Sequence, residues 1–470
     1  MALAPLLVVV LVCLIVVALA AQNSGWLSPT ARPQFYPAWL SGPLSGLWPT
    51  SAPAHHTLRL WVSGLLGVMF VAYVLVLHDV RRIDARWLIG AILAVHLLFL
   101  LAPPLQYTDV FNYINYGRMG VVHHLDPYTT LPLREPHSDP AYSLSNWHYL
   151  RSPYGPLFTL MTYALVPLGV AASLWAIKII VAICSLGLLT LVWRMARLLG
   201  RSPKLAVAFV GLNPIVLVWG LGGEHNDFIM MFLVFGAIFL LLAPRLRREL
   251  GQLGNDVLRL GSLHIDYELA AGVVLVAAVG IKASAAIFLP LAIVIARRRR
   301  SLLIGIAGAA ALLILASLLA FGPHLGGVRA QSTLVSPEGL PNLLGMLLGL
   351  GGETAALRGL LSGVAAAVIL LAAARAWRRP LGAMEYGCVC ALALIFTLGW
   401  SAPWYVLWVL PFAAVLASNR WRWLVILYTL YALIASGPNL AELETDLHFY
   451  PRTTRLGREH VAQFDHLAAF

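Results

Sequence analysis

The sequence predicts an all-α, polytopic membrane protein with about 13 transmembrane helices, and with juxtamembrane helices in its extracytoplasmic loops. Of its 470 residues, 60% are hydrophobic and only 11% are charged, whereas a soluble domain carries roughly 25% charged residues. The mean hydropathy is +0.82. Apolar runs long enough to cross a bilayer recur from one end of the chain to the other.

Short polar hinges separate the apolar runs, and each run defines an expected span. The spans cover residues 2–21, 57–77, 87–101, 171–192, 205–221, 228–243, 269–281, 283–296, 302–321, 355–374, 383–398, 405–417 and 423–436. The first run resembles a signal peptide in length, but no basic residues precede its apolar part as they do in such a peptide. We therefore favour an uncleaved first membrane helix, and a cleaved signal peptide is the alternative.

The basic residues give the orientation of the spans. The stretch 156–169 is only modestly apolar, and we interpret it as a helix that lies along the membrane interface. The basic hinges then share one side of the membrane; they are 81–86, 194–204, 245–248, 297–300, 375–379 and 420–422. Because Lys and Arg concentrate in cytoplasmic loops, that side is predicted to be cytoplasmic. The first large loop, 104–170, is then extracytoplasmic.

Two parts of unequal size are expected: a transmembrane catalytic domain, 1–438, and a short extracytoplasmic tail, 439–470. A net charge of +12 would normally suggest nucleic acid as a partner. Here the positive residues lie in short clusters between apolar runs, so we expect them to contact membrane lipid and no nucleic acid. All four cysteines lie inside apolar runs, which indicates neither a disulfide framework nor a zinc site.

The polar stretch 106–128 is where the functional site is expected. On a helix, Asp109, Tyr113 and Tyr116 share one face, because they are spaced i, i+4 and i+7. An acid beside a membrane surface is costly unless it is solvated, paired or used. Asp109 is therefore our candidate catalytic residue. The alternative is that Asp109 only caps the helix that follows it, a role for which Asp is favoured.

Other outer loops carry polar and aromatic groups that we expect to bind substrate beside Asp109. They are Arg118, His123, His124, Asp126 and Tyr128, then Tyr154, then Glu224, His225, Asn226 and Asp227, then Lys282, and finally Trp404 and Tyr405. Several have a structural alternative. Asp126 can begin a turn, Asn226 and Asp227 can cap a helix, and Lys282 can extend from an apolar run toward water.

A single acid near basic side chains suggests transfer of a group from a phosphate to a hydroxyl. A phosphate departs without a proton donor, so one general base is enough to activate the hydroxyl. Arg118 and Lys282 suit the charge of such a phosphate. Glycoside hydrolysis would ordinarily need two opposed carboxylates, and Asp126 or Asp227 could supply the second.

Seven short segments, in their order along the chain, resemble a known family. They are Asp109-Val110-Phe111-Asn112-Tyr113, Tyr116-Gly117-Arg118, Leu125-Asp126-Pro127-Tyr128, Pro153-Tyr154-Gly155-Pro156-Leu157-Phe158, Gly222-Gly223-Glu224-His225-Asn226-Asp227, Ile281-Lys282-Ala283 and Pro403-Trp404-Tyr405. The pattern resembles the GT-C glycosyltransferases. More narrowly, it resembles the actinobacterial polyprenyl-phosphomannose-dependent α-1,6-mannosyltransferases.

This resemblance implies a fold, a reaction and a location. The fold would be of the GT-C type, in a bacterial plasma membrane with the active site on the extracytoplasmic side. The reaction would be an inverting transfer of a sugar, with mannose favoured, from a polyprenyl-phosphate donor to a glycan or glycolipid acceptor. The family's acid falls on Asp109 as the base, and the helix after Tyr154 would lie along the membrane.

A transporter or flippase of lipid-linked sugars is the second hypothesis. Such proteins carry polar groups at mid-membrane, and here His96, Lys178 and Asn213 are the main polar residues inside expected spans. Because most other polar residues lie at the rims, we favour the enzyme. No cofactor is expected. His123 and His124 diverge on a helix and predict no metal site, although a divalent metal is left open.

Overall fold

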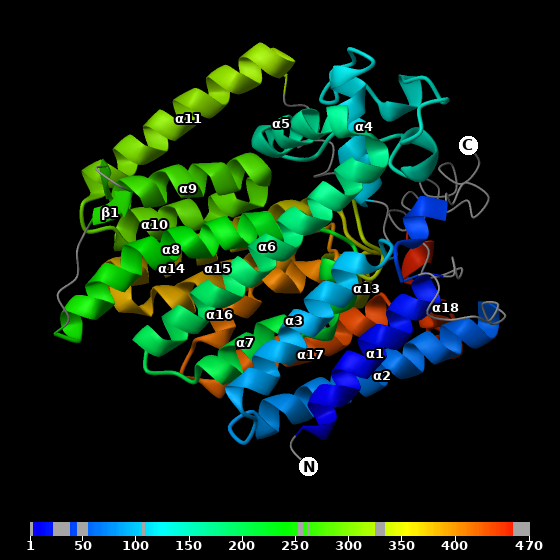
Figure 1. Ribbon diagram of the computed structural model, residues 1–470, viewed down its shortest axis with the longest axis horizontal. Coiled ribbons are helices and arrows are strands. Elements are labelled where there is room, and N and C mark those ends of the chain that lie inside the picture. The colour runs from blue at the N-terminus through cyan, green and yellow to red at the C-terminus, as the bar shows by residue number, and fades with distance from the viewer. Residues whose placement is uncertain are drawn as a thin grey trace.

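The computed structural model describes residues 3–21, 38–44, 55–105, 109–251, 257–260, 263–324 and 334–454. Within these ranges the chain forms a thick bundle of helices, with a loop-rich region around helix α4 at one end (Figure 1). Two parts of the sequence interpretation, residues 106–108 of the polar stretch and residues 455–470 of the predicted tail, lie outside the described residues.

The first half of the chain contains the following elements, in which η marks a short 3₁₀ or π helix. They are α1 (Ala4–Ala20), η3 (Ala38–Ser41), α2 (His55–Asp79), α3 (Ala85–Leu101), α4 (Asp109–Val121), η5 (Pro132–Arg134), η6 (Tyr142–Leu144), α5 (Pro156–Leu165), η7 (Val166–Leu168), α6 (Gly169–Leu198), α7 (Pro203–Gly211), η8 (Val216–Leu221) and α8 (Asp227–Glu249).

The second half begins with a short hairpin and continues as helices. Its elements are β1 (Val257–Leu260), β2 (Leu263–Asp266), α9 (Tyr267–Ile281), η9 (Ala283–Phe288), α10 (Leu289–Ile295), α11 (Arg299–Phe321), α13 (Leu340–Leu347), α14 (Ala355–Arg378), η10 (Pro380–Gly382), α15 (Ala383–Thr397), η11 (Pro403–Trp408), α16 (Leu410–Ala414), α17 (Asn419–Ala435), α18 (Leu440–Asp446) and η12 (Pro451–Thr453).

The β1–β2 hairpin is the departure from the predicted all-α fold. The two strands pair antiparallel, with Val257 opposite Asp266 and Leu260 opposite Leu263. The sequence contains a signal for it, because Gly261-Ser262 separates two short stretches rich in Val, Leu and Ile, which is typical of a two-residue hairpin. The helical bundle itself is as predicted.

Every predicted span contains helix, but the helices differ in length and continuity. By length and composition, six helical segments of the described chain can cross a membrane, or up to seven if α17 and α18 are one bent span. Four shorter apolar helices are Ala4–Ala20, Ala85–Leu101, Tyr267–Ile281 and Ala283–Ile295. The predicted spans 205–221 and 405–417 are broken, as α7–η8 and η11–α16. The protein is thus a polytopic helical membrane protein.

Side-chain caps determine where several helices begin. Asp84 accepts a hydrogen bond from the Arg86 N–H at the start of α3, and Ser202 accepts one from the Leu205 N–H at the start of α7. Asp266 caps α9 in the same way. Such caps satisfy main-chain donors that have no partner inside the helix. The helices α3, α7 and α9 therefore begin at positions that the sequence encodes locally.

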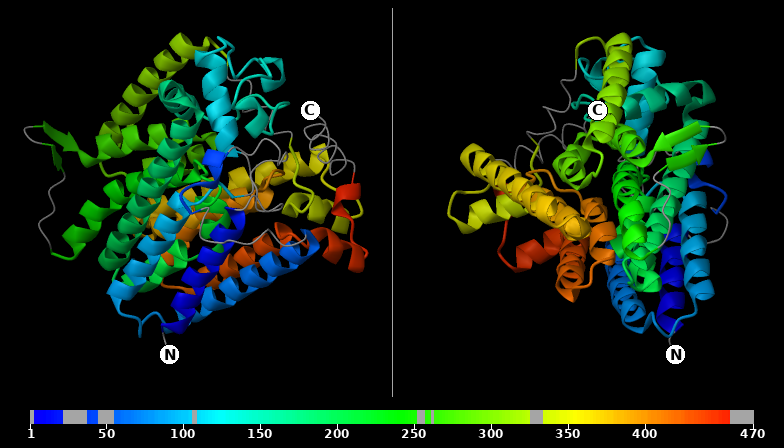
Figure 2. Two further views of the ribbon diagram at one scale, coloured as in Figure 1. Left: turned by 45° about the vertical axis from the view of Figure 1, so that its right-hand side comes forward. Right: turned by 90° about the vertical axis from the view of Figure 1, so that its left-hand side faces the viewer.

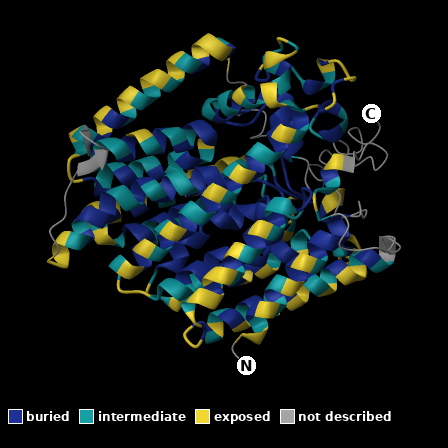
Figure 3. Ribbon diagram, viewed as in Figure 1, coloured by how far each residue is buried: buried dark blue, intermediate teal, exposed yellow. Residues whose placement is uncertain are grey.

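Burial separates a protein-lined core from a lipid-facing shell (Figure 3). Of the 18-residue apolar stretch in each helix, 72% is buried in α8, compared with 17% in α11 and 22% in α14. Leu319 of α11 is 81% exposed, which suits contact with acyl chains. The broken segments η8 and η11 consist of buried residues. Irregular main chain at membrane depth is tolerated where protein surrounds it, so the breaks mark the interior of the bundle.

The basic hinges and α4 lie at opposite ends of the helices. The turns after α2, before α7 and before α17 gather at one end, and α4, α5 and α13 lie toward the other (Figures 1 and 2). Gly169, with a φ of 80°, is the first residue of the long helix α6 and follows η7. Because α5, η7 and α6 form one continuous helical segment, Pro156–Leu198, the interpretation of α5 as a helix along the membrane surface stays a prediction.

The first prediction is that Ser138 is extracytoplasmic and that Leu250 is cytoplasmic. Both residues are exposed, and the four native cysteines are buried, so Ser138→Cys and Leu250→Cys can each be labelled against a low background. In intact cells an impermeant maleimide should label the Ser138 variant and should label the Leu250 variant only after the membrane is opened. Labelling in the reverse order would contradict this topology.

Candidate functional site

Helix α4 begins at Asp109 and presents its carboxylate to the interior of the loop region. The Asp109 side chain is 14% exposed. The indole Nε1 of Trp147 donates a hydrogen bond of 3.1 Å to Asp109 Oδ1, and the Trp147 main-chain N–H donates one of 3.0 Å to Asn112 Oδ1. Asn112 therefore positions the tryptophan that holds the acid. Trp147 is a cavity residue that the sequence analysis missed, because 38 residues separate it from Asp109.

The loop that follows the π helix η8 brings a second group of polar residues to α4. Leu105 N–H donates to Gly222 O at 2.6 Å. A Cβ at Gly223 would lie 2.5 Å from Trp219 O, so no side chain fits there. Glu224 has a φ of 51°, in the left-handed region. Its carboxylate accepts a hydrogen bond of 2.6 Å from Lys178 Nζ of α6, and both side chains are buried. This pair stabilises the strained turn.

A buried ion pair joins the N-terminus of α8 to the end of α9. Lys282 Nζ lies 2.9 Å from each oxygen of Asp227. Trp408 Nε1 of η11 donates to Asp227 Oδ1 at 2.6 Å. The ammonium also lies 4.7 Å from the ring centroid of Tyr405, within cation–π range. Lys282 is therefore fixed inside the protein, and the alternative in which it extends toward water does not describe this side chain.

The main chain beside Lys282 is packed against the loop between α4 and α5, without side chains between them. Lys282 is extended, with φ −151° and ψ 125°, which separates α9 from η9. Gly155 N–H donates to Ile281 O at 3.0 Å. A Cβ at Gly155 would lie 2.2 Å from Gly280 O. The Pro153-Tyr154-Gly155-Pro156 segment thus allows the loop to approach the lysine closely.

His225 lies between Asp109 and Trp404. Its ring stacks on Trp404 with centroids 3.4 Å apart, and its Nδ1 lies 3.5 Å from Asp109 Oδ2. Burial, together with the positive charge of Lys282, holds the pKa of His225 well below its usual range. The contact with Asp109 is therefore one between a carboxylate and a neutral ring.

One cavity brings many of the predicted residues together. Its lining includes the side chains of Asp109, Tyr113, Tyr116, Tyr154, Asp227, Lys282, Trp404 and Tyr405, together with Trp147, Leu150, Pro153, Leu334 and Trp400. These residues come from α4, the loop between α4 and α5, α8, the α9–η9 junction, the segment before α13, the segment between α15 and η11, and η11 itself. The cavity therefore contains an acid, a paired acid and ammonium, and a wall of aromatic rings.

Burial dominates the electrostatics of Asp109. Burial is the largest of four effects that together raise the pKa of this carboxyl to about 6. The hydrogen bond from Trp147 and the charge of Lys282 lower the pKa, and the charge of Asp227 raises it. The group is thus half ionised near pH 6. A pKa near the working pH is what a general acid or base requires.

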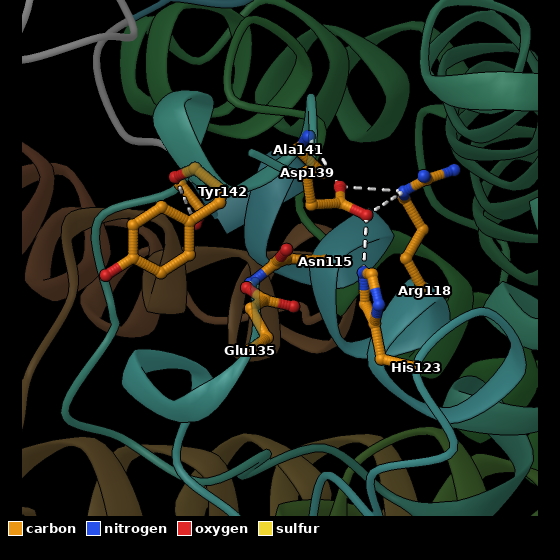
Figure 4. Close-up of polar contacts among 8 residues, drawn as sticks. Asn115, Arg118, His123, Glu135, Asp139, Ala141 and Tyr142 are labelled. Atoms are coloured by element: carbon orange, nitrogen blue, oxygen red, sulfur yellow. Dashed lines mark hydrogen bonds and ion pairs between the residues drawn. The ribbon is translucent and has the colours of Figure 1, made fainter. Parts of the chain in front are cut away.

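Arg118 and His123 do not line this cavity. They engage Asp139: Arg118 Nε donates to its two oxygens at 2.9 and 3.0 Å, and His123 Nε2 lies 2.7 Å from Oδ2 (Figure 4). Although burial raises the pKa of Asp139, the hydrogen bonds from Arg118, Ala141 N–H and His123 lower it more. Nine helical positions separate Arg118 from Asp109, which is about 13 Å along the axis.

The same cluster contains a second buried acid that the sequence analysis did not single out. Asn115 Nδ2 donates to Glu135 Oε1 at 2.6 Å (Figure 4). Burial raises the pKa of Glu135 to about 8, so this carboxyl is largely protonated at neutral pH. The cluster braces the C-terminal half of α4 against the loop.

Three further predicted residues have structural roles in the loop. His124 has a φ of 54° where the chain turns after α4. Asp126 accepts hydrogen bonds from Tyr128 N–H at 2.9 Å and from Thr129 Oγ1 at 3.1 Å, which is the turn geometry expected of Asp. The Tyr128 hydroxyl donates to Tyr154 O at 3.0 Å. These residues shape the loop beneath the cavity.

Asn226 lies beside the cavity in an unusual state. It is 1% exposed, and its N–H donates to the Tyr113 hydroxyl at 3.4 Å. Neither its side-chain oxygen nor its side-chain nitrogen has a hydrogen-bond partner in the described structure. It occupies the N-cap position of α8 without making a side-chain cap. Among the described residues, no group of three His, Cys, Asp or Glu side chains could hold a metal ion.

The fold and the site define a polytopic membrane protein with a cavity, lined by charged and aromatic side chains, at one end of its helices. A family model described as "Alpha-(1->6)-mannopyranosyltransferase, N-terminal domain" matches residues 7–298, more than half of the chain. The chain therefore belongs to the alpha-(1->6)-mannopyranosyltransferase family, and the resemblance deduced from the seven segments is confirmed.

Curated relatives agree with this assignment. The chain is 32% identical over 150 residues to alpha-(1->6)-mannopyranosyltransferase A of Mycobacterium tuberculosis, which covers 31% of this chain and 29% of that protein. It is 27% identical over 398 residues to a second alpha-(1->6)-mannopyranosyltransferase of that species, covering 70% and 66%. A probable alpha-(1->6)-mannopyranosyltransferase of Mycolicibacterium smegmatis is 26% identical over 388 residues, covering 74% and 69%.

The chain spans less than two thirds of the length of the first two of these relatives. No solved structure matches the chain. The family assignment thus rests on the sequence comparisons. The geometry of the cavity is the basis on which an activity is proposed below.

The second prediction is that Asp109 titrates with a midpoint near pH 6, because burial raises its pKa to about 6. Infrared difference spectroscopy of the purified protein should show a protonated-carboxyl band that disappears as the pH rises through this value and that is absent from Asp109→Asn. Trp147→Phe removes a donor that stabilises the carboxylate, so the midpoint should move to higher pH. A midpoint close to that of free Asp, about 3.9, would show that water solvates the group.

Proposed function

We propose that the protein is a membrane glycosyltransferase that moves a sugar from a polyprenyl-phosphate donor to a glycan or glycolipid acceptor, with mannose as the favoured sugar. The observation that carries this proposal is that Asp109 and Lys282 face one cavity. One supplies a base for the acceptor hydroxyl, and the other supplies a cation for the donor phosphate. The names of the relatives support transfer of mannose.

Asp109 is the acid best suited to be the base. Asp227 is held by Lys282 and Trp408, so its lone pairs are already used in strong hydrogen bonds. Asp126 accepts bonds within its own turn. Asp109 accepts one hydrogen bond from Trp147 and lines the cavity, so its carboxylate can still accept a proton.

Lys282 is the proposed contact for the donor phosphate. An ammonium has three N–H groups, so Lys282 can hold Asp227 and also donate to a phosphate oxygen. The pair is buried, where electrostatic interactions are stronger than in water. Asp227 and Trp408 then keep the ammonium in place, so little reorganisation is needed when charge develops on the leaving group.

The proposed reaction is a single displacement. The Asp109 carboxylate takes the proton of the acceptor hydroxyl, and the acceptor oxygen forms a bond to the anomeric carbon. The bond between that carbon and the donor phosphate oxygen breaks, and its electron pair leaves with the polyprenyl phosphate. The configuration at the anomeric carbon inverts because the attack and the departure occur on opposite faces. No second carboxylate is needed.

The aromatic lining suits the other parts of the substrates. Tyr113 and Tyr154 pack edge to face with centroids 4.7 Å apart, and Trp147 and Trp400 do so at 5.6 Å. Rings held in this way present rigid apolar faces with polar handles, which fit the C–H surfaces and hydroxyls of a sugar. We extend the proposal to a GT-C fold of about 13 spans, in a bacterial plasma membrane with the cavity outside.

The transporter hypothesis has less support because the polar groups inside the bundle are satisfied by the protein. His96 lies 2.8 Å from Ile92 O and 2.9 Å from Ser185 Oγ. Asn213 donates to Thr429 Oγ1 at 3.0 Å. Lys178 pairs with Glu224. Buried polar groups with internal partners are costly to separate, so they are poor components of a moving substrate path.

The third prediction separates a base from a helix cap at position 109. Asn caps a helix about as well as Asp but cannot accept the proton. Both Asp109→Asn and Asp109→Ala should therefore lower the transfer rate by about 100- to 10,000-fold, with donor binding retained. The assay uses purified protein in liposomes, radiolabelled polyprenyl-phosphate mannose and a mannoside acceptor. Near-normal transfer by Asp109→Asn would exclude the base role.

The fourth prediction concerns the donor phosphate. Lys282→Ala should weaken donor binding by roughly 10- to 150-fold, the worth of one charge-assisted contact. That change also leaves Asp227 buried without its partner, which costs about 3–5 kcal/mol. The double variant Asp227→Asn, Lys282→Gln removes both charges and leaves no buried charge without a partner. If its melting temperature is normal and its donor KM still rises, the effect of Lys282 is on donor binding and not on stability.

Arg118→Gln is the matched control for Lys282. The structure places Arg118 on the buried Asp139 and outside the cavity. The donor KM should therefore stay close to that of the wild type, and the loss of one partner of this pair should lower only the melting temperature. A rise in the donor KM as large as that of Lys282→Ala would instead support the expectation that Arg118 contacts the phosphate.

A further inference from the structure

A second, larger cavity lies at the end of the bundle opposite to Asp109. It is a groove of about 580 Å³ between the end of α2, the start of α7 and the start of α17. These three helix ends lie together at the lower left of the bundle, while α4 lies at the upper right (Figure 1). The groove belongs to no part of the proposed active site, and it lies on the side where the basic hinges gather.

The walls of this groove are largely apolar. Leu75 of α2, Leu205 of α7 and Ile426 of α17 line it. Leu75 is 45% exposed. At the mouth, Trp423 is 55% exposed, and Trp is enriched at the level of lipid headgroups. A surface of this kind on a membrane protein meets acyl chains and headgroups together.

Two arginines at the groove lack a carboxylate partner among the described residues. Arg422 donates to two neutral oxygens, Leu416 O at 2.6 Å and Asn419 Oδ1. Arg81 is exposed and makes no side-chain ion pair there. The acids nearby are paired with other cations: Asp79 with Arg82 at 3.0 Å, Asp84 with Arg86 at 3.2 Å, and Glu385 with Arg420 at 2.9 Å.

Further positive charge surrounds these two arginines. Burial, and after it the like charge of Arg201, lowers the pKa of Arg422. Lys204 holds the turn after α2, because its Nζ donates to Arg81 O at 3.0 Å and to Ile83 O at 2.7 Å. This contact fixes the main chain that carries Arg81. The rim of the groove is therefore an ordered, uncompensated cluster of cations, which attracts an anion.

We propose that this groove binds an anionic phospholipid, with its phosphate on Arg81 and Arg422 and one acyl chain along Leu75, Leu205 and Ile426. Guanidinium groups bind phosphate oxygens by paired hydrogen bonds. Basic pockets between membrane helices are typical sites for lipid headgroups. The apolar walls favour a lipid over a free phosphate ion. By contacting α2, α7 and α17 at once, the lipid stabilises three segments that are distant in the sequence.

The test is native mass spectrometry of the full-length protein in detergent, titrated with phosphatidylglycerol and, separately, with phosphatidylcholine. We expect one tightly bound phosphatidylglycerol and markedly weaker phosphatidylcholine. The variant Arg81→Gln, Arg422→Gln should bind phosphatidylglycerol roughly 30-fold more weakly, as the loss of two charges near a lipid surface predicts. The control variant Arg375→Gln, Arg378→Gln removes two exposed arginines from the end of α14 on the same side and should bind as wild type.

A third variant tests the acyl-chain part of the groove without changing any charge. Leu205→Trp fills the groove from α7 and should also abolish the tightly bound lipid. Unchanged phosphatidylglycerol binding in the arginine variant, or equal binding of phosphatidylcholine by the wild type, would overturn the proposal. Displacement of the lipid by millimolar inorganic phosphate would identify a site for phosphate alone. A dimer that disappears in Leu205→Trp would identify a second copy of the chain as the occupant. Both of these outcomes also overturn it.

Discussion

The buried pair of Lys282 and Asp227 is the interaction on which the geometry of the cavity at Asp109 depends. It joins the break between α9 and η9 to the first residue of α8, and Trp408 joins η11 to the same carboxylate. Removing one partner of a buried pair leaves the other charge uncompensated, at a cost of about 3–5 kcal/mol. Three segments that are far apart in the sequence are therefore positioned by one carboxylate, and none of them can shift without exposing a charge to an apolar interior.

The turn before α8 is the second constraint on this geometry, and it is a strained one. A left-handed conformation at a residue with a side chain is uncommon, yet Glu224 adopts it, with a φ of 51°. The bond to Lys178 compensates for this conformation. As a result His225 stacks on Trp404 and Asp227 reaches Lys282. Strain of this kind is typical of functional sites, where the surrounding structure maintains a geometry that the local chain does not favour.

Hydropathy made most of the fold predictable, because a membrane helix must be apolar over its whole length. The broken segments were harder to predict. The run 205–221 reads as one span, but Asn213 accepts hydrogen bonds from the N–H groups of Ile215 and Val216, and Pro214 follows it; together they end α7 and precede the π helix. Apolar composition hides such a break, and only the Asn-Pro pair indicates it. The hairpin formed by β1 and β2 was missed for a different reason: each strand is short, and the hairpin lies between two predicted spans.

The sequence predicted part of the cavity lining, but not the contacts between side chains. The segments that carry Asp109, Asp227, Lys282 and Trp404 meet at one cavity. Arg118 was expected beside them, but position along α4 and the attraction of Asp139 place it elsewhere. Trp408 was detectable, because it lies four residues after Trp404 in the same aromatic segment. Trp147 was not, since its contact with Asp109 depends on the path of the intervening loop.

The contact at Gly155 has a consequence for how members of this family can diverge. The main chain of the loop at Gly155 touches the main chain before Lys282 directly, with no room even for a methyl group. The spacing between the two halves of the cavity is thus determined by backbone atoms, which amino-acid replacement elsewhere does not alter. Replacing a side chain that lines the cavity would not by itself change this main-chain contact. Selection can therefore exchange one sugar or acceptor for another while the distance across which a proposed transfer occurs stays constant.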